Sequence, residues 1–159
     1  MPKKAVPPPL PEYLSFLKPY SAEVRDLALA TRALVFEEAP DASELIYDAY
    51  NAVASGYTFT GRPSDAFIHI AVYAKWVNLG FNRGSQLQDT FQMLQGSGRW
   101  VRHIRISELA DLKQPAIRAL VKQSIAQAER PAKATATAAP KSVVRAIYPK
   151  RRRPVRQSS

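Results

Sequence analysis

The chain has 159 residues, of which 46% are hydrophobic and none is cysteine. This length suits a single domain with a full core, and the lack of cysteine excludes disulfides, thiolate metal sites and cysteine nucleophiles. No stretch approaches the roughly 18 consecutive apolar residues of a membrane span, and the first residues include lysines but no apolar signal segment. We therefore expect a cytoplasmic protein that has no membrane partner.

The net charge of +10 is concentrated at the two ends of the chain. Nine of the 23 Lys and Arg residues lie beyond residue 129, where there is no acid, and two more are Lys3 and Lys4. The remaining 12 Lys and Arg residues lie between these ends together with all 13 acidic residues, so this part of the chain is nearly neutral. We expect a flexible lead-in over 1–9, one domain over 10–129 and a disordered basic tail over 130–159, because the tail has few large apolar residues to offset the entropy of ordering it.

The proline-rich segment Pro7 to Pro11 predicts an extended, polyproline-like lead-in, and it also matches a PxxP ligand. Two consecutive helices are expected after it. The first is capped by Ser21 and carries apolar residues at every third or fourth position. Asp41, followed three residues later by Glu44, is a capping-box arrangement, so we expect a second helix through Tyr50.

Between Ala66 and Phe81 the pattern changes to alternation, which predicts two strands joined by a tight turn. With Ala74 and Lys75 as the turn, every cross-strand pair is defined. The apolar pairs face one side: Val72 with Val77, Ile70 with Leu79, and Ile68 with Phe81. The mixed pairs face the other side: Tyr73 with Trp76, Ala71 with Asn78, and His69 with Gly80.

A further strand is predicted over 99–106, with Arg102 on its apolar face, and Pro115 is expected to begin a last helix. A buried arginine needs a partner, so we expect Arg102 to pair with Asp89 and to pin the loop between them. The glycines at 96–98 next to this strand would allow a phosphate-binding nest of N–H groups, although a flexible turn is the simpler interpretation.

Spaced motifs run from Phe67 to Leu112. They are Ile68-His69-Ile70, Val77-Asn78-Leu79-Gly80-Phe81, Gly84-x-x-Leu87-x-Asp89 and Leu94-x-Gly96-x-Gly98-x-x-x-Arg102-His103-Ile104-x-Ile106. In these motifs the chain resembles the YdhG-like family of bacterial domains of unknown function, although Thr90 stands where the family often has proline. The resemblance implies an α+β fold in which an antiparallel sheet of about four strands has helices before and after it packed on the sheet. Some members are described as frataxin-like iron chaperones.

Six polar or aromatic residues share the sheet face opposite the apolar pairs and form the candidate ligand-binding site: His69, Tyr73, Trp76, Asn78, His103 and Arg105. Arg105 offers a charge and Trp76 a stacking surface for an anionic or aromatic ligand. A sheet surface that faces solvent, or that a helix covers, would show the same pattern without any ligand.

Acidic residues cluster at the expected second helix: Glu37, Glu38, Asp41, Glu44 and Asp48. Carboxylates suit a hard cation such as iron, and the last three would share one helix face. Acids at the start of a helix also serve its dipole. No serine–histidine–acid set or catalytic carboxylate pair is evident, so we expect no enzyme and no cofactor, with frataxin-like iron binding as the alternative.

Five basic residues of the tail are the candidate nucleic-acid contacts: Lys150, Arg151, Arg152, Arg153 and Arg156. Few aromatic residues accompany them, so they predict nonspecific attraction to phosphates and no base readout. A solubilising extension is the other interpretation. Together these features predict a binding or accessory domain for an unidentified ligand or protein, with nonspecific nucleic-acid affinity from the tail.

Overall fold

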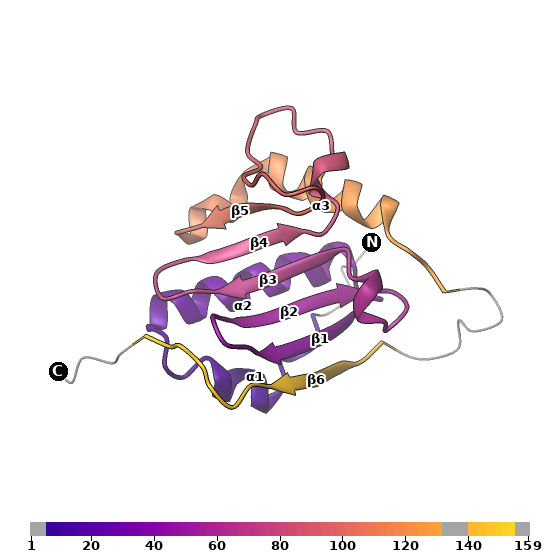
Figure 1. The fold of residues 1–159 in the computed structure, drawn as a ribbon. Coiled ribbons are helices and arrows are strands. Elements are labelled where there is room, and N and C mark those ends of the chain that lie inside the picture. Colours follow the sequence, from indigo (N-terminus) through magenta and orange to yellow (C-terminus); the bar gives the residue numbers. More distant parts are fainter. Residues whose placement is uncertain (1–5, 132–139, 155–159) are drawn as a thin grey trace.

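The computed structural model describes residues 6–131 and 140–154 (Figure 1). The helices are α1 (Pro11–Phe16), α2 (Ala22–Glu38) and α3 (Pro115–Gln127), and the short 3-10 turns are η1 (Pro63–Asp65), η2 (Gly84–Gln86) and η3 (Leu109–Lys113). The strands are β1 (Ser43–Asp48), β2 (Val53–Thr58), β3 (Ile68–Val72), β4 (Val77–Phe81), β5 (Arg102–Ile106) and β6 (Ser142–Ile147). Over the residues that the structure describes, no helix is long and apolar enough to cross a membrane.

The strands form one sheet in the order β5-β4-β3-β2-β1-β6. All neighbours are antiparallel except β6, which runs parallel to β1. Helix α2 packs on β3, β4 and α3, so the helices lie behind the sheet in Figure 1 and leave its front face without a helix. The α+β class is confirmed. The expected sheet of about four antiparallel strands becomes a six-stranded mixed sheet.

The predicted β3–β4 hairpin is confirmed. The structure pairs Val72 with Val77, Ile70 with Leu79, and Ile68 with Phe81. The Tyr73 N–H donates to the Trp76 carbonyl at 2.9 Å and closes the turn at the expected place. The six apolar side chains are fully buried, because alternation with a period of two places all of them on the face that the helices cover.

The local signals for α2 and α3 also hold. Ser21 Oγ accepts a hydrogen bond from the Val24 N–H at 3.2 Å, and α2 ends at Glu38, two residues before Pro40. Pro115 occupies the first turn of α3, where a missing N–H costs nothing. The buried residues of α3 are Ile117, Leu120, Val121 and Ser124.

The second helix, expected through Tyr50, is wrong, because β1 occupies this stretch. Asp41 and Glu44 have the spacing of a capping box, but Glu44 points into the core. Its carboxylate accepts hydrogen bonds from Arg32 of α2 at 2.8 Å and from the Tyr57 hydroxyl of β2 at 2.9 Å. Partners far away in the sequence therefore override the local capping signal.

The prediction of a tail that is disordered throughout is wrong for residues 142–147, which form β6. The Glu44 N–H donates to the Lys141 carbonyl and the Tyr148 N–H to the Asp48 carbonyl, both at 2.9 Å. Ser142 Oγ also donates to the Glu44 carboxylate at 2.8 Å. Residues 132–139 and 155–159, with the candidate Arg156, lie outside the described residues.

Candidate functional site on the open sheet face

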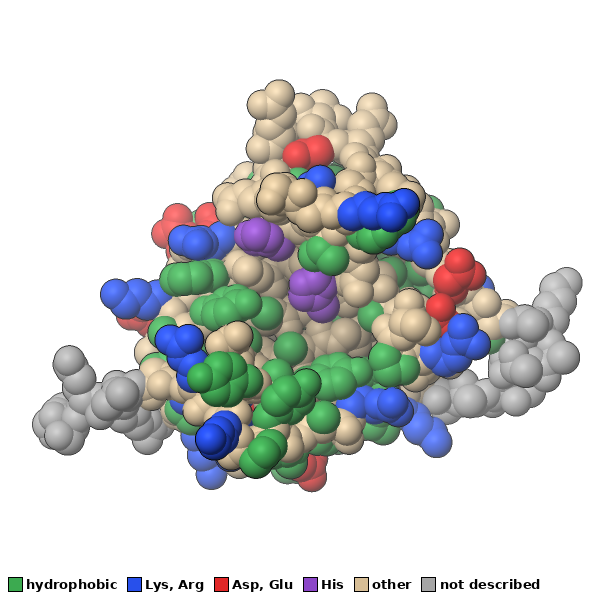
Figure 2. Space-filling model, in the orientation of Figure 1, with side chains coloured by type: hydrophobic (Ala, Val, Ile, Leu, Met, Phe, Trp, Pro, Cys, Tyr) green, Lys and Arg blue, Asp and Glu red, His purple; other side chains and the backbone are tan. Residues whose placement is uncertain are grey.

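One face of the sheet carries no helix, and we call it the open face (Figure 2). By strand register, its outward positions on β1 to β5 are Ser43, Leu45, Tyr47, Ala54, Gly56, Thr58, His69, Ala71, Asn78, Gly80, His103 and Arg105. None of these residues is acidic. Figure 2 shows the two histidines near the middle of this face, with hydrophobic side chains gathered below them. The open face therefore carries four of the six candidate ligand-binding residues.

The two histidines flank one glycine. His69 of β3 and His103 of β5 are both register partners of Gly80 on β4. A Cβ atom on Gly80 would lie 2.0 Å from His69 Nε2, so the His69 ring occupies the space that a side chain there would need. His69 Nδ1 lies 2.8 Å from Asn82 Oδ1. Because an amide oxygen only accepts, this contact places a hydrogen on Nδ1, so that in the neutral ring Nε2 is an acceptor.

Tyr73, Trp76 and Arg105 form a stack at the turn end of β3 and β4. The Tyr73 and Trp76 rings lie 5.6 Å apart, and the Arg105 guanidinium lies 4.0 Å from the centre of the Trp76 ring. Two buried polar atoms beside the stack, Trp76 Nε1 and Asn78 Oδ1, have no hydrogen-bond partner in the described part of the chain. The structure thus brings together the charge and the aromatic ring that the sequence suggested for a ligand, and it joins them as a cation–π pair.

The C-terminal segment places two arginines in the same depression as the two rings of this stack. Asp48 forms ion pairs with Arg151 and Arg153, and the Arg152 N–H donates to the Tyr50 carbonyl at 2.6 Å. Tyr73, Trp76, Arg152 and Arg153 then line an open depression of about 420 Å³; its other lining residues are Tyr20, Asn51, Ala74 and Pro154. We call Tyr73, Trp76, Arg105, Arg152 and Arg153 the aromatic–arginine site. Lys150, the remaining described candidate of the tail, is exposed.

The acidic residues do not converge. Each is paired with an arginine: Glu37 and Glu38 with Arg118, Asp41 with Arg130, Glu44 with Arg32, and Asp48 with Arg151 and Arg153. Since β1 is a strand, Asp41, Glu44 and Asp48 share no helix face. Among the described residues, no three His, Asp or Glu side chains lie close enough together to hold a metal ion.

Asp89 and Arg102 are both described, and they do not form the expected ion pair. The Asp89 carboxylate accepts the N–H groups of Met93 and Leu94, both at 2.9 Å. Arg102 instead donates to the Gly98 carbonyl at 2.5 Å, and its Cβ packs where a Cβ on Gly84 would lie. Arg102 does hold the glycine-containing loop, but through a main-chain carbonyl.

Sequence reasoning missed Arg32, which is 2% exposed. Its guanidinium binds both Glu44 oxygens, at 2.8 and 3.2 Å, and donates to the Pro7 carbonyl at 2.7 Å. Tyr57 bonds to the same carboxylate, and burial beside that negative charge raises its pKa well above the usual value. A position on the apolar side of α2 was the only sequence signal for Arg32. This buried network connects five parts of the chain: the lead-in, α2, β1, β2 and β6.

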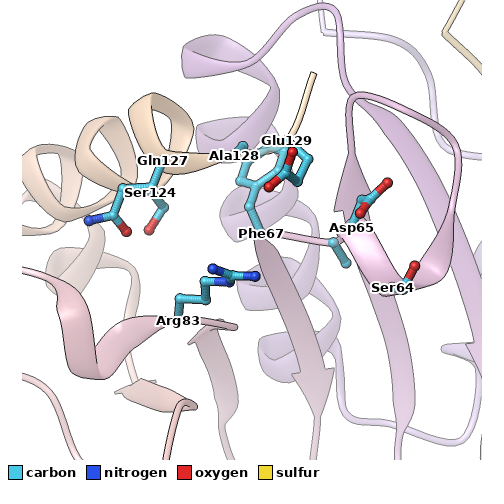
Figure 3. Close-up of a pocket in the computed structure, with 9 residues that line it drawn as sticks. Ser64, Asp65, Phe67, Arg83, Ser124, Gln127, Ala128 and Glu129 are labelled. Carbon is cyan, nitrogen blue, oxygen red and sulfur yellow. The ribbon is translucent and has the colours of Figure 1, made fainter. Parts of the chain in front are cut away.

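Another, much smaller cleft of about 30 Å³ lies beside α3 (Figure 3). Ser124 and Gln127 come from α3, Asp65 comes from η1 across the cleft, and Arg83 reaches between them. Asp65 already accepts a hydrogen bond from Thr60 Oγ1 at 2.6 Å. The described residues that line the cleft include no histidine, so they assemble no histidine–acid pair for catalysis.

No protein-family model, curated protein or solved structure gives a significant match to this chain. The resemblance to YdhG-like domains therefore stays a prediction.

Proposed function

We propose that the protein binds single-stranded nucleic acid on its open face, without strong sequence preference, and that the aromatic–arginine site is the main contact. The observation that carries this proposal is that Tyr73 and Trp76 line one open depression with Arg152 and Arg153, while Arg105 lies over the Trp76 ring. Bases that are not paired stack on aromatic rings, while arginines neutralise the phosphates between them.

The charges around the stack favour a polyanion. No acid lies at an outward position of β1 to β5, and neither Arg105 nor Arg152 forms an ion pair within the described residues. Asp48 neutralises part of the charge of Arg151 and Arg153, but it fixes their segment beside the sheet. Residues 140–154 of the basic tail thus contribute as a docked segment, which lowers the entropy that binding costs.

Iron binding has less support, because every carboxylate of the expected acidic ridge is paired with an arginine. A cation would have to displace those arginines first. The YdhG-like assignment and a cytoplasmic location remain part of the proposal, with the lack of cysteine in favour of the location.

The test is the affinity of Trp76→Ala for a labelled, mixed-sequence single strand of about 12 nucleotides, within the usual site sizes of such proteins. Loss of one stacked base should weaken binding by about 1–3 kcal/mol, roughly 5- to 150-fold. Phe91→Ala is the matched control, because Phe91 is 72% exposed in a loop away from the stack and its loss should change nothing. Wild-type affinity in Trp76→Ala would refute the proposal.

A charge test uses the same oligonucleotide. Arg152→Gln should weaken binding and reduce the slope of log Kd against log salt by about one phosphate contact, whereas Lys150→Gln, on the same segment but outside the depression, should change the slope less. An equal effect of both substitutions would place the cation contact in the tail as a whole and contradict a defined site.

A further inference from the structure

A second tryptophan, Trp100, lies close to two arginines at the opposite end of β4. The Arg99 and Arg83 guanidinium groups lie 5.1 and 6.0 Å from the centre of the Trp100 ring, which is 43% exposed. Neither arginine forms an ion pair with any described acid. Ser85 fixes this cluster beside η2, because its N–H donates to the Trp100 carbonyl at 3.0 Å and its Oγ to the Arg99 carbonyl at 2.9 Å.

The two tryptophan–arginine clusters lie at the two ends of β4, and we call the stretch between them the track. Trp76 immediately precedes β4 and Arg83 follows it, seven residues later, which is about 23 Å along an extended strand. Between them the outward side of β4 carries Asn78 and Gly80, and the flanking strands carry His69 and His103. The track therefore has cations and an aromatic ring at each end and no acid between them.

We propose that Trp100, Arg83 and Arg99 form a second contact for the same nucleic-acid strand, whose backbone follows β4 past the two histidines. This inference rests on the proposed function, since it extends that site. A strand with a rise of about 3.4 Å per nucleotide needs about seven nucleotides to span the track, and an unstacked strand needs fewer. A dinucleotide reaches only one cluster, whereas a longer strand engages both and gains from the high effective concentration of the second contact.

The occupant is a single strand because both ends offer a flat ring next to cations. In a duplex the base faces are already stacked on one another, so neither ring can take them, and only the arginines would contribute. A flexible single strand can also change direction at each end of β4, where the chain leaves the sheet.

The experiment measures Kd for thymidine oligonucleotides of about 2, 4, 8 and 12 nucleotides, lengths chosen to bracket the span of the track. Trp100→Ala should leave the affinity of the dinucleotide unchanged and weaken the two longest strands by about 5- to 150-fold. Trp76→Ala should weaken all lengths. Arg83→Gln with Arg99→Gln provides a second variant that keeps the Trp100 ring, and it should reduce the salt slope only for the long strands.

The two proposals fail separately. If Trp100→Ala and the double arginine variant bind the long strands as the wild type does, or weaken every length equally, the second contact is refuted while the aromatic–arginine site stands. If Trp76→Ala binds every length like the wild type, the proposed function itself falls. Phe91→Ala again serves as the control for removal of an exposed ring.

Discussion

Gly80 makes room for the His69 ring on the open face, and this close approach explains why glycine occupies the position. A Cβ on Gly80 would force the imidazole away from Asn82, whereas a Cβ on Gly56 would meet Ala66 Cβ at an ordinary 3.5 Å. Gly56→Ala should gain the stability that alanine has over glycine in a strand. We expect Gly80→Ala to be less stable than Gly56→Ala by roughly 1–2 kcal/mol in urea unfolding. Equal stabilities would refute this role for Gly80.

The pKa of His69 is lowered, mainly because burial disfavours the imidazolium ion; the bond to Asn82 opposes the shift and the charge of His103 adds to it. In the unfolded chain a histidine has a pKa of about 6.5. As the pH falls below that value, the unfolded chain takes up a proton that folded His69 does not. The free energy of unfolding should therefore decrease as the pH decreases, by at most about 1.4 kcal/mol per pH unit, until His69 is protonated in the folded protein as well.

The measurement is urea unfolding of the wild type and of His69→Gln over about pH 5–8, a range that brackets the histidine pKa. The variant lacks this titration, so the difference in free energy of unfolding between the wild type and His69→Gln should become smaller as the pH decreases. Parallel curves would show that His69 titrates alike in both states.

At the scale of single residues, the sequence predicts which side of a strand a side chain occupies, but not its partners. His69 lies on the expected face because alternation alone decides that. Arg102 was assigned to Asp89, yet it bonds to the Gly98 carbonyl, and no spacing rule identifies a main-chain acceptor. Arg32 lies on an apolar helix side where its pairing with Glu44 becomes visible only in three dimensions.

Among the elements, β1 is held from both sides by its two acids. Glu44 binds Arg32 under the helices, and Asp48 binds Arg151 and Arg153 beside β6. The β3–β4 hairpin was predictable because its two strands adjoin in sequence. β6 was not predictable, because its partner β1 lies about a hundred residues earlier and no local pattern in the sequence indicates a pairing over that separation.

Glu44→Gln should lower the free energy of unfolding by about 3–5 kcal/mol, because it leaves the Arg32 charge buried without a counter-ion. Adding Arg32→Met should recover part of that loss, since an apolar chain needs no partner. Chemical denaturation of the single and double variants measures the coupling. Strictly additive losses would contradict a buried pair.

Asp48→Asn should loosen the C-terminal segment without unfolding the rest. Hydrogen exchange over 140–154 should become faster, because the free energy of local opening should fall by roughly 1.5–3 kcal/mol when the charge-assisted bonds of Asp48 are lost. Asp41→Asn is the matched control, since Asp41 and its partner Arg130 are both half exposed and such pairs contribute little. Exchange that is unchanged in Asp48→Asn would show that β6 is held by main-chain pairing alone.

At the scale of the whole molecule, the two faces of the sheet differ, because helices cover one face and the other carries no helix (Figure 1). The covered face supplies the core, and the open face carries outward side chains without an acid. The net charge of +10 is concentrated at the two ends of the chain, where it would attract polyanions, whereas in the proposed function the two tryptophan–arginine clusters define where a strand binds. The composition alone predicts the attraction of polyanions by the net charge, but it does not predict the two clusters.

The most direct test maps the bound strand by amide chemical-shift changes during titration with a thymidine oligonucleotide of about 12 nucleotides, a typical site size. The largest changes should fall on β3, β4 and β5 around Ala71, Asn78, Gly80 and Arg105, and on residues 148–154. The amides on the solvent side of α2 and α3 should stay in place. Changes concentrated on those helices, with the open face unmoved, would contradict the account.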